Sequence, residues 1–194
     1  MFKSIRRTII ATTAALAIGI GGAVWATTAA SASASAASAG TAASAVTPTC
    51  STANLAVWVD ISQGSGAAGT ISYPLDFTNT GSRACTLRGF PGVSATNANG
   101  AQIGRAAGWN PLFKSKTVTI PAGGSAHADL FWVEVGNFTA SGCRPTTASL
   151  IKVYPPSRKS AALGFFSLQG CRSTKPLYTY LYVTTVQPGV GHML

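Results

Sequence analysis

Apolar and polar residues alternate one by one along most of the chain beyond residue 50. From Ile71 onward, for example, Tyr73, Leu75 and Phe77 continue one apolar face, while polar side chains occupy most of the positions between them. A period of two is that of a β-strand with one buried face. The same pattern predicts seven further strands, at residues 55–60, 84–88, 117–120, 126–135, 149–154, 163–168 and 177–186.

Turn-forming residues separate these segments, among them Asn79-Thr80-Gly81, Pro91-Gly92, Asn99-Gly100, Pro121-Ala122-Gly123-Gly124 and Pro155-Pro156. Short strands spaced in this way predict an all-β fold, and we expect an antiparallel immunoglobulin-like β-sandwich of seven to eight or more strands. Pro74 cannot donate a backbone hydrogen bond, so its strand is expected at a sheet edge or with a bulge at that residue. Trp58 and Trp132 each lie in an alternating segment and are expected in the core.

The first fifty residues follow a different pattern. Lys3, Arg6 and Arg7 precede an uncharged stretch and then a run of Ala and Ser, an order that is typical of a secretory signal peptide. We assign residues 1–36 to it, and its end is approximate because several Ala-x-Ala sites follow one another. A retained membrane anchor is the alternative, and the Arg6-Arg7 pair leaves the twin-arginine export route open beside the general one.

By composition, the rest of the chain divides into a linker, a folded domain and a short tail. Residues 37–49 are rich in Ala, Ser and Thr and predict a flexible linker. The β-sandwich domain is expected at residues 50–188 and a loose tail at residues 189–194. After signal cleavage we expect no membrane span.

Four cysteines follow the export signal: Cys50, Cys85, Cys143 and Cys171. An even number in an oxidising compartment predicts two disulfide bonds. Of the three possible pairings we favour Cys50 with Cys85 and Cys143 with Cys171, because each closes a loop of roughly thirty residues. The cysteines have no paired spacing and no histidine near them, so no metal site is predicted.

The charge of the chain narrows the choice of partner. Of the 194 residues, 9% are charged, with 14 Lys and Arg against 4 Asp and Glu. Eleven basic and four acidic residues remain without the signal peptide, a net charge of +7. The longest basic run is Arg158-Lys159, and such scattered charge disfavours nucleic-acid binding. The net positive charge favours attraction to an anionic envelope polymer. In the alternative, this charge only keeps a secreted protein soluble.

Several short motifs together resemble a known family. They are Asn79-Thr80-Gly81, Cys85-Thr86-Leu87-Arg88-Gly89-Phe90-Pro91-Gly92-Val93, Gly100, Ile120-Pro121-Ala122-Gly123-Gly124-Ser125-Ala126, Trp132, Cys143, Pro155-Pro156 and Cys171. Their order and spacing over residues 50 to 187 resemble the domain of unknown function 4232. This resemblance implies an exported protein of actinomycete-type bacteria, commonly tethered by an Ala/Ser/Thr-rich linker, and it implies no biochemical activity. No lipobox precedes Cys50, which favours release or non-covalent retention.

Residues suited to catalysis are scarce. Outside the signal peptide the histidines are His127 and His192. His127 and Asp129 are expected on one face of a strand, about 7 Å apart, but the nearby Ser125 lies in a Gly-Gly-Ser turn rather than in a nucleophile elbow. Four acidic residues in total make a paired-carboxylate glycosidase site improbable. Phosphate loops, redox cysteine pairs and cofactor fingerprints are absent from the sequence, so no catalytic residue and no cofactor are predicted.

The best candidates for binding are aromatic. Tyr178, Tyr180 and Tyr182 alternate along the last predicted strand, and three phenol rings on one exposed face would suit stacking on sugars. In the alternative, these rings form ordinary cross-strand pairs on a solvated sheet. Trp109 lies between Gly108 and Asn110-Pro111, in an expected loop, and is a second candidate for exposure.

These observations predict a secreted, extracellular or cell-wall-associated β-sandwich module that is not an enzyme. Its expected partner is cell-wall glycan or an anionic envelope polymer. The alternative is a structural or interaction module that binds a surface protein, and a hydrolase ranks third.

Overall fold

The computed structural model describes residues 46–192. The predicted signal peptide and the linker up to residue 45 therefore lie outside the described residues, as do positions 193–194.

The described chain is built mainly from strands. They are β1 (Leu55–Val59), β2 (Ser65–Ala67), β3 (Thr70–Asn79), β4 (Cys85–Arg88), β5 (Gly92–Thr96), β6 (Gly108–Trp109), β7 (Thr117–Ile120), β8 (Ser125–Val133), β9 (Pro145–Tyr154), β10 (Ala162–Cys171), β11 (Leu181–Val183) and β12 (Gln187–Pro188). The helical elements are α1 (Ala140–Cys143) and the 3-10 turns η1 (Thr52–Asn54), η2 (Ile61–Gln63), η3 (Val135–Asn137) and η4 (Pro176–Tyr178). The predicted all-β fold is confirmed, while its immunoglobulin-like topology stays a prediction.

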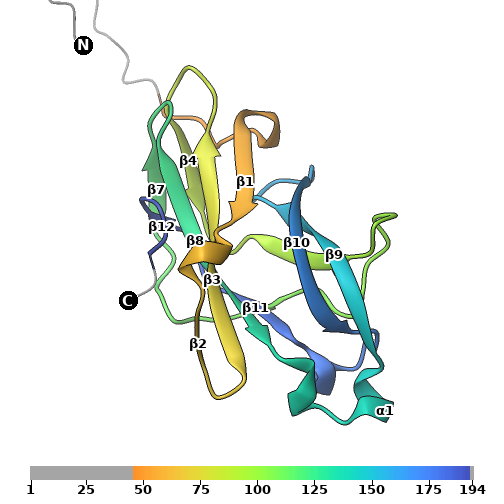
Figure 1. Ribbon diagram of the computed structural model, residues 1–194. Helices are drawn as coiled ribbons and strands as arrows, with labels where there is room; N and C mark the ends of the chain where they lie inside the picture. The colour runs from red at the N-terminus through yellow and green to blue at the C-terminus, as the bar shows by residue number, and fades with distance from the viewer. Residues whose placement is uncertain (1–45, 193–194) are drawn as a thin grey trace, which may run out of the picture. The chain divides into compact units, whose positions relative to one another are not determined.

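The strands form three sheets. The largest has the order β1-β3-β8-β11-β6, with β2 added to β3 and β12 to β8. A second has the order β10-β9-β5, and β4 pairs with β7 in the third (Figure 1). Pairing between these strands is antiparallel except between β11 and β6, which run parallel. The edge position of β6 is the feature of this topology that matters for the site.

One hydrophobic core joins the three sheets. Leu75 and Leu130 from the largest sheet, Ile151 from the second and Leu87 from the third are all fully buried in it. Alternation along each strand explains this, because every second side chain of β3, β8, β9 and β10 faces the same layer. The Tyr73 ring meets the Phe166 ring edge-on at 5.2 Å and so links β3 to β10.

Pro74 lies inside the largest sheet rather than at its edge. It pairs with Asp129 of β8, and its carbonyl accepts a hydrogen bond of 2.9 Å from the Asp60 amide just after β1 ends. The nitrogen and carbonyl of a strand residue point to the same side of the strand. The Pro74 nitrogen, which has no N–H to donate, therefore faces Asp60, the residue between the end of β1 and the start of η2. The expectation of an edge strand was wrong because β1 stops one residue short of Pro74.

The two tryptophans expected in the core have different surroundings. Trp132 is half-buried, and its indole nitrogen donates to the Gln169 carbonyl at 2.9 Å. Trp58 is 43% exposed, because Val57 and Val59 rather than Trp58 face inward from β1. The prediction of a buried Trp58 was therefore wrong, because the inward-facing residues of β1 are its two neighbours.

Both predicted disulfides are present. Cys50 bonds to Cys85 and Cys143 to Cys171, with Cα–Cα distances of 4.8 and 4.7 Å. Two disulfides are consistent with a protein that folds outside the cytoplasm.

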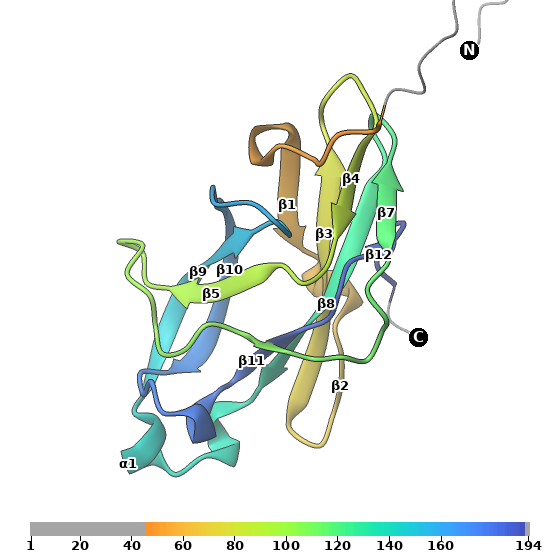
Figure 2. The same cartoon turned by 180° about the vertical axis from the view of Figure 1, so that it is seen from behind.

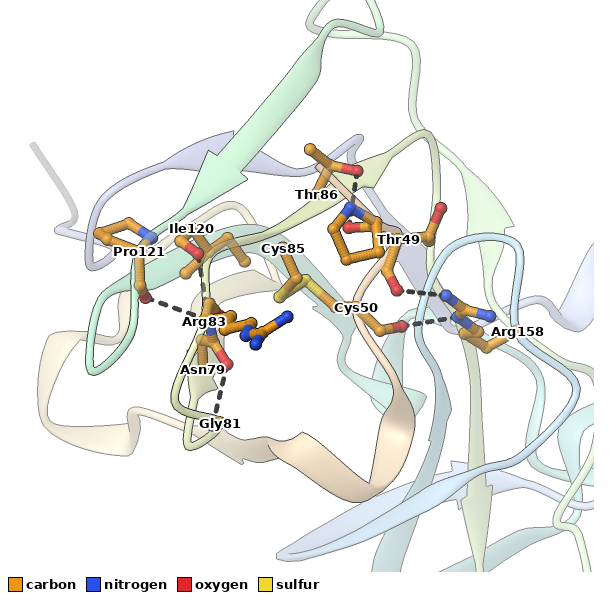
Figure 3. The surroundings of a disulfide bond; sticks show 11 residues. Thr49, Cys50, Asn79, Gly81, Arg83, Cys85, Thr86, Ile120, Pro121 and Arg158 are labelled. Atoms are coloured by element: carbon orange, nitrogen blue, oxygen red, sulfur yellow. Dashed lines mark hydrogen bonds between the residues drawn. A yellow bond between two sulfur atoms is a disulfide. The ribbon is translucent and has the colours of Figure 1, made fainter. Parts of the chain in front are cut away.

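Hydrogen bonds around Cys50 fix the start of the fold (Figure 3). The Arg158 guanidinium donates to the carbonyls of Thr49 and Cys50. The Thr86 amide donates to the Pro48 carbonyl at 2.8 Å. Asn79 is also buried here, and its side-chain amide donates to the carbonyls of Arg83, Ile120 and Pro121. The hydrogen bonds that anchor this end of the domain therefore reach back to Pro48, two residues before Cys50.

The segment after β12 is held against the largest sheet, whereas a loose tail was expected from residue 189. The Gly189 amide donates to the Ser125 carbonyl at 3.1 Å, and the Gly191 amide donates to Oδ1 of the buried Asp76 at 3.0 Å. Gly191 is itself buried, and a Cβ there would lie 2.4 Å from Pro74 Cβ. The backbone amides of two glycines thus explain an attachment that composition alone does not reveal.

Among residues 46–192, no helix has the length and apolar character that crossing a membrane requires.

Candidate functional site

The three tyrosines expected on one exposed face lie in three different environments. Tyr178 ends the 3-10 turn η4, and Tyr180 precedes β11, which contains only Leu181 to Val183. Strand alternation therefore does not extend over residues 178–182, and the predicted ladder was wrong. Pro176 at the start of η4 explains the break, because its fixed φ favours a turn.

Tyr180 is fully buried and cannot contact a ligand at the surface. Its hydroxyl donates to the Ile103 carbonyl at 2.8 Å, and burial raises the pKa of its phenol. Gly104, which follows Ile103 in the chain, has φ +65°, and a Cβ on it would lie 2.1 Å from the Cys171 carbonyl oxygen. Tyr180 and Gly104 therefore position the chain that enters Arg105.

Tyr178 packs against residues that precede it by about forty positions, beside η3 and in α1. Its ring meets the Phe138 ring edge-on at 5.9 Å. A Cβ on Gly142 would collide with the Tyr178 hydroxyl. Tyr178 is therefore a packing residue of the α1 end of the domain.

Trp109 is the aromatic residue of β6, and 70% of its surface is accessible. It pairs with Val183 of β11, and the following Asn110 amide donates to the Val183 carbonyl at 2.8 Å. Its ring stacks on Phe90 with a centroid distance of 5.0 Å and an interplanar angle of 8°. The backbone and Phe90 together hold one broad indole face in a fixed orientation toward solvent.

Tyr182 is the tyrosine that stays near Trp109. It pairs with Gly108, and a Cβ on Gly108 would lie 2.7 Å from the Tyr182 ring, so only glycine lets the ring lie over β6. Because Gly108 and Trp109 are successive residues of one strand, Tyr182 and Trp109 flank β6 on opposite sides. The rings are neighbours but do not form one flat face.

A hollow of about 440 Å³ lies on the Tyr182 side of β6. Its lining includes Gln102, Arg105, Gly108, Thr174, Thr179 and Tyr182. The Arg105 side chain is exposed, and its guanidinium donates a hydrogen bond to the Thr174 carbonyl at 3.4 Å. We call Phe90, Arg105, Trp109 and Tyr182 the edge-strand site, since they surround the short edge strand β6.

A larger hollow of about 690 Å³ lies between η1 and the turn that joins β9 to β10. Ser51, Thr52, Arg158 and Lys159 are among the residues that line it. No aromatic ring lines this hollow, and Arg158 is already bound to the carbonyls of Thr49 and Cys50. It is therefore better explained as a structural junction around the first disulfide.

His127 and Asp129 share a face of β8 with Ser125, as the sequence predicted, but they are not connected as a catalytic relay. The Ser125 hydroxyl lies 2.9 Å from that of Thr78, and His127 Nδ1 lies 3.0 Å from the Gly189 carbonyl. Burial raises the pKa of the Asp129 carboxyl, and His127 opposes this shift. This arrangement holds the C-terminal segment and presents no activated hydroxyl.

Metal ligands do not gather in the part of the chain that the structure describes, since no three His, Cys, Asp or Glu side chains lie close enough to hold an ion.

The sequence of this domain matches a known family. The model of the family described as Domain of unknown function (DUF4232) matches residues 50–187. The chain belongs to the DUF4232 family. A search of curated proteins found no match, and a search of solved structures found none either.

The DUF4232 region contains the whole edge-strand site, from Phe90 to Tyr182. Trp109 and Tyr182 were candidates from the sequence, whereas Phe90 and Arg105 were not. Phe90 stands in the turn Gly89-Phe90-Pro91-Gly92, where an aromatic residue beside turn formers is a signal for exposure. Nothing in the sequence links it to a tryptophan nineteen residues away.

Proposed function

We propose that the mature DUF4232 protein is a secreted, non-catalytic module of the cell envelope that binds cell-wall glycan at the edge-strand site. The single observation that carries this proposal is the exposed Trp109 ring stacked on Phe90. The signal-like leader, the Ala/Ser/Thr-rich linker and the two disulfides support a place outside the cytoplasm.

The chemistry of the site suits carbohydrate. An indole face offers a flat apolar surface to the C–H groups of a sugar ring, while hydroxyl and amide groups around it satisfy the sugar hydroxyls. The stack on Phe90 restricts the indole before binding, so less side-chain entropy is lost when a ligand docks. Across β6, the Arg105 guanidinium and the Tyr182 phenol add polar contacts for a second sugar unit.

A second candidate function rests on a different surface. Phe165 is 91% exposed and Leu163 59% exposed, both on the outer face of the edge strand β10. Exposed apolar side chains on a sheet edge favour binding to another protein. This pair supports the alternative of a surface interaction module.

Pull-down on purified bacterial cell walls at low and high salt tests the proposal. Stacking should resist salt, whereas attraction of the +7 domain to an anionic polymer should fade as salt screens it. Trp109→Ala should weaken the salt-resistant binding roughly tenfold, a loss of about 1.4 kcal/mol. Phe165→Ala is the matched control, since it removes an even more exposed aromatic ring elsewhere on the surface. Binding that Trp109→Ala leaves intact and Phe165→Ala removes would favour the interaction module instead.

A further inference from the structure

The irregular chain between β6 and β7 carries an exposed apolar pair that is followed by two lysines. Leu112 is 60% and Phe113 39% exposed, and Lys114 and Lys116 are exposed as well. Neither apolar side chain belongs to the core or to the partly buried residues packed against it. Figure 2 shows this segment as irregular chain that leads from beside β11 to the start of β7. We call these four residues the docking turn.

The chain on either side of the docking turn is cationic in sequence. Positions 77 to 128 contain five basic residues and no acidic one. Arg88 is exposed at the end of β4, where it pairs with Thr117, the residue that follows Lys116. Pairing between β4 and β7 therefore brings a third cation next to the two lysines of the turn.

We propose that the docking turn binds an anionic lipid surface. Apolar side chains flanked by lysines are the combination that settles at a membrane interface, because the apolar groups enter the acyl boundary while the cations remain at the headgroups. A soluble polyanion would use the lysines but would leave Leu112 and Phe113 in water. The apolar pair is thus the feature that selects lipid over polymer.

Such docking is weak and reversible. Two apolar side chains bury little area, and each lysine near an anionic surface strengthens binding by about fivefold. The docking turn shares no residue with the edge-strand site, so this inference does not rest on glycan binding. A module that carries both surfaces would contact glycan while it rests on the membrane.

Vesicle co-sedimentation of the mature, disulfide-bonded protein tests the inference. The probes are vesicles of phosphatidylcholine with a quarter of phosphatidylglycerol, and vesicles of phosphatidylcholine alone. The wild type should bind the anionic vesicles and lose most of that binding on neutral ones. Lys114→Gln with Lys116→Gln should weaken binding by roughly twentyfold, and Leu112→Ser with Phe113→Ser by at least tenfold.

Two controls keep the result specific. Leu163→Ser with Phe165→Ser removes an apolar pair of the same composition from β10 and should leave vesicle binding within twofold of the wild type. Lys159→Gln with Lys175→Gln, which removes two exposed lysines from other parts of the chain, should also leave it within twofold. The inference is overturned if anionic vesicles are not bound. It is equally overturned if binding depends on the lysines but not on Leu112 and Phe113, since that result indicates a polyanion surface.

Discussion

Tyr180 is buried beside Gly104, which lines the hollow of the edge-strand site, and its hydroxyl donates to the Ile103 carbonyl at 2.8 Å. Both groups are buried, so no water replaces the bond if the hydroxyl is removed. A buried carbonyl that loses its donor destabilises the native state by about 1–3 kcal/mol.

Tyr180→Phe should therefore lower the free energy of unfolding by about 1–2 kcal/mol in urea titrations. Tyr182→Phe is the control, because that ring is half-buried and its hydroxyl should cost less than about 0.5 kcal/mol to remove. Equal stability of both variants would contradict the positioning role of Tyr180.

Asp76 is the second residue whose environment makes a prediction. It is fully buried, Oδ1 accepts from the Gly191 amide, and Oδ2 has no hydrogen-bond partner. Burial raises the pKa of its carboxyl, although the Gly191 bond and His127 oppose the shift. A raised folded-state pKa means that the native state favours the protonated acid. Its contribution to stability is complete below about pH 4 and is lost as the pH rises through the folded-state pKa.

Replacement of Asp76 by Asn should remove this pH dependence. We expect the stability of the wild type relative to Asp76→Asn to be greatest near pH 4 and to fall toward pH 7, as measured by urea unfolding at a series of pH values. The conservative change keeps an oxygen for the Gly191 amide. A wild-type advantage that grows with pH would contradict a raised pKa.

At the scale of elements, the strands with strict alternation could be predicted from the sequence. β3, β4, β7, β8, β9 and β10 all fall on predicted segments, because apolar and polar residues alternate along each of them and turn residues lie near their ends. The short strands β2, β6 and β12 could not, since two or three residues carry no periodicity. β5 was missed because Val93-Ser94-Ala95-Thr96, although it alternates, contains a single large apolar side chain and directly follows the Pro91-Gly92 turn.

The candidate site was only partly predictable for the same reason. Trp109 could be identified because a tryptophan between a glycine and Asn-Pro indicates an exposed turn. The tyrosine series was misleading, since a 3-10 turn changes which side each ring faces. The Phe90–Trp109 stack joins two elements through tertiary packing, and local patterns carry no information about it.

The two disulfides act on elements that are distant in the chain, and both should contribute to stability. Replacing Cys143 and Cys171 by Ser opens a loop with a sequence separation of 28. This change should cost roughly 3–4 kcal/mol of unfolding free energy, and the Cys50 and Cys85 pair should cost a similar amount.

Denaturant titration of both double variants without reductant measures these costs. Intact mass after alkylation of the unreduced wild type should show no added label, because every cysteine is bonded. Label uptake by the folded wild type would contradict the two-disulfide structure.

At the scale of the whole domain, the edge-strand site and the docking turn are the two surfaces to which we assign partners. Few acidic groups reach the surface, since Asp76 is buried, Asp60 and Asp129 are half-buried, and Glu134 alone is exposed, against eleven basic residues outside the leader. The basic residues are left to define the surface, and exposed aromatic or aliphatic side chains lie beside them at Trp109 and at the docking turn. Apolar side chains that lie together on the surface mark interaction sites more often than scattered ones do. We infer that both surfaces have partners in the envelope.

The central claim is that Trp109 contacts glycan, and an NMR titration of the ¹⁵N-labelled mature protein tests it most directly. The protein without its leader has three indole N–H groups, from Trp58, Trp109 and Trp132, and single Trp→Phe variants assign them. Soluble cell-wall glycan fragments, added at high salt, should shift the Trp109 indole and the amides of Gly108 and Tyr182, while the Phe165 amide stays in place. Shifts that cluster around Phe165, or spectra that do not change at all, would contradict the account.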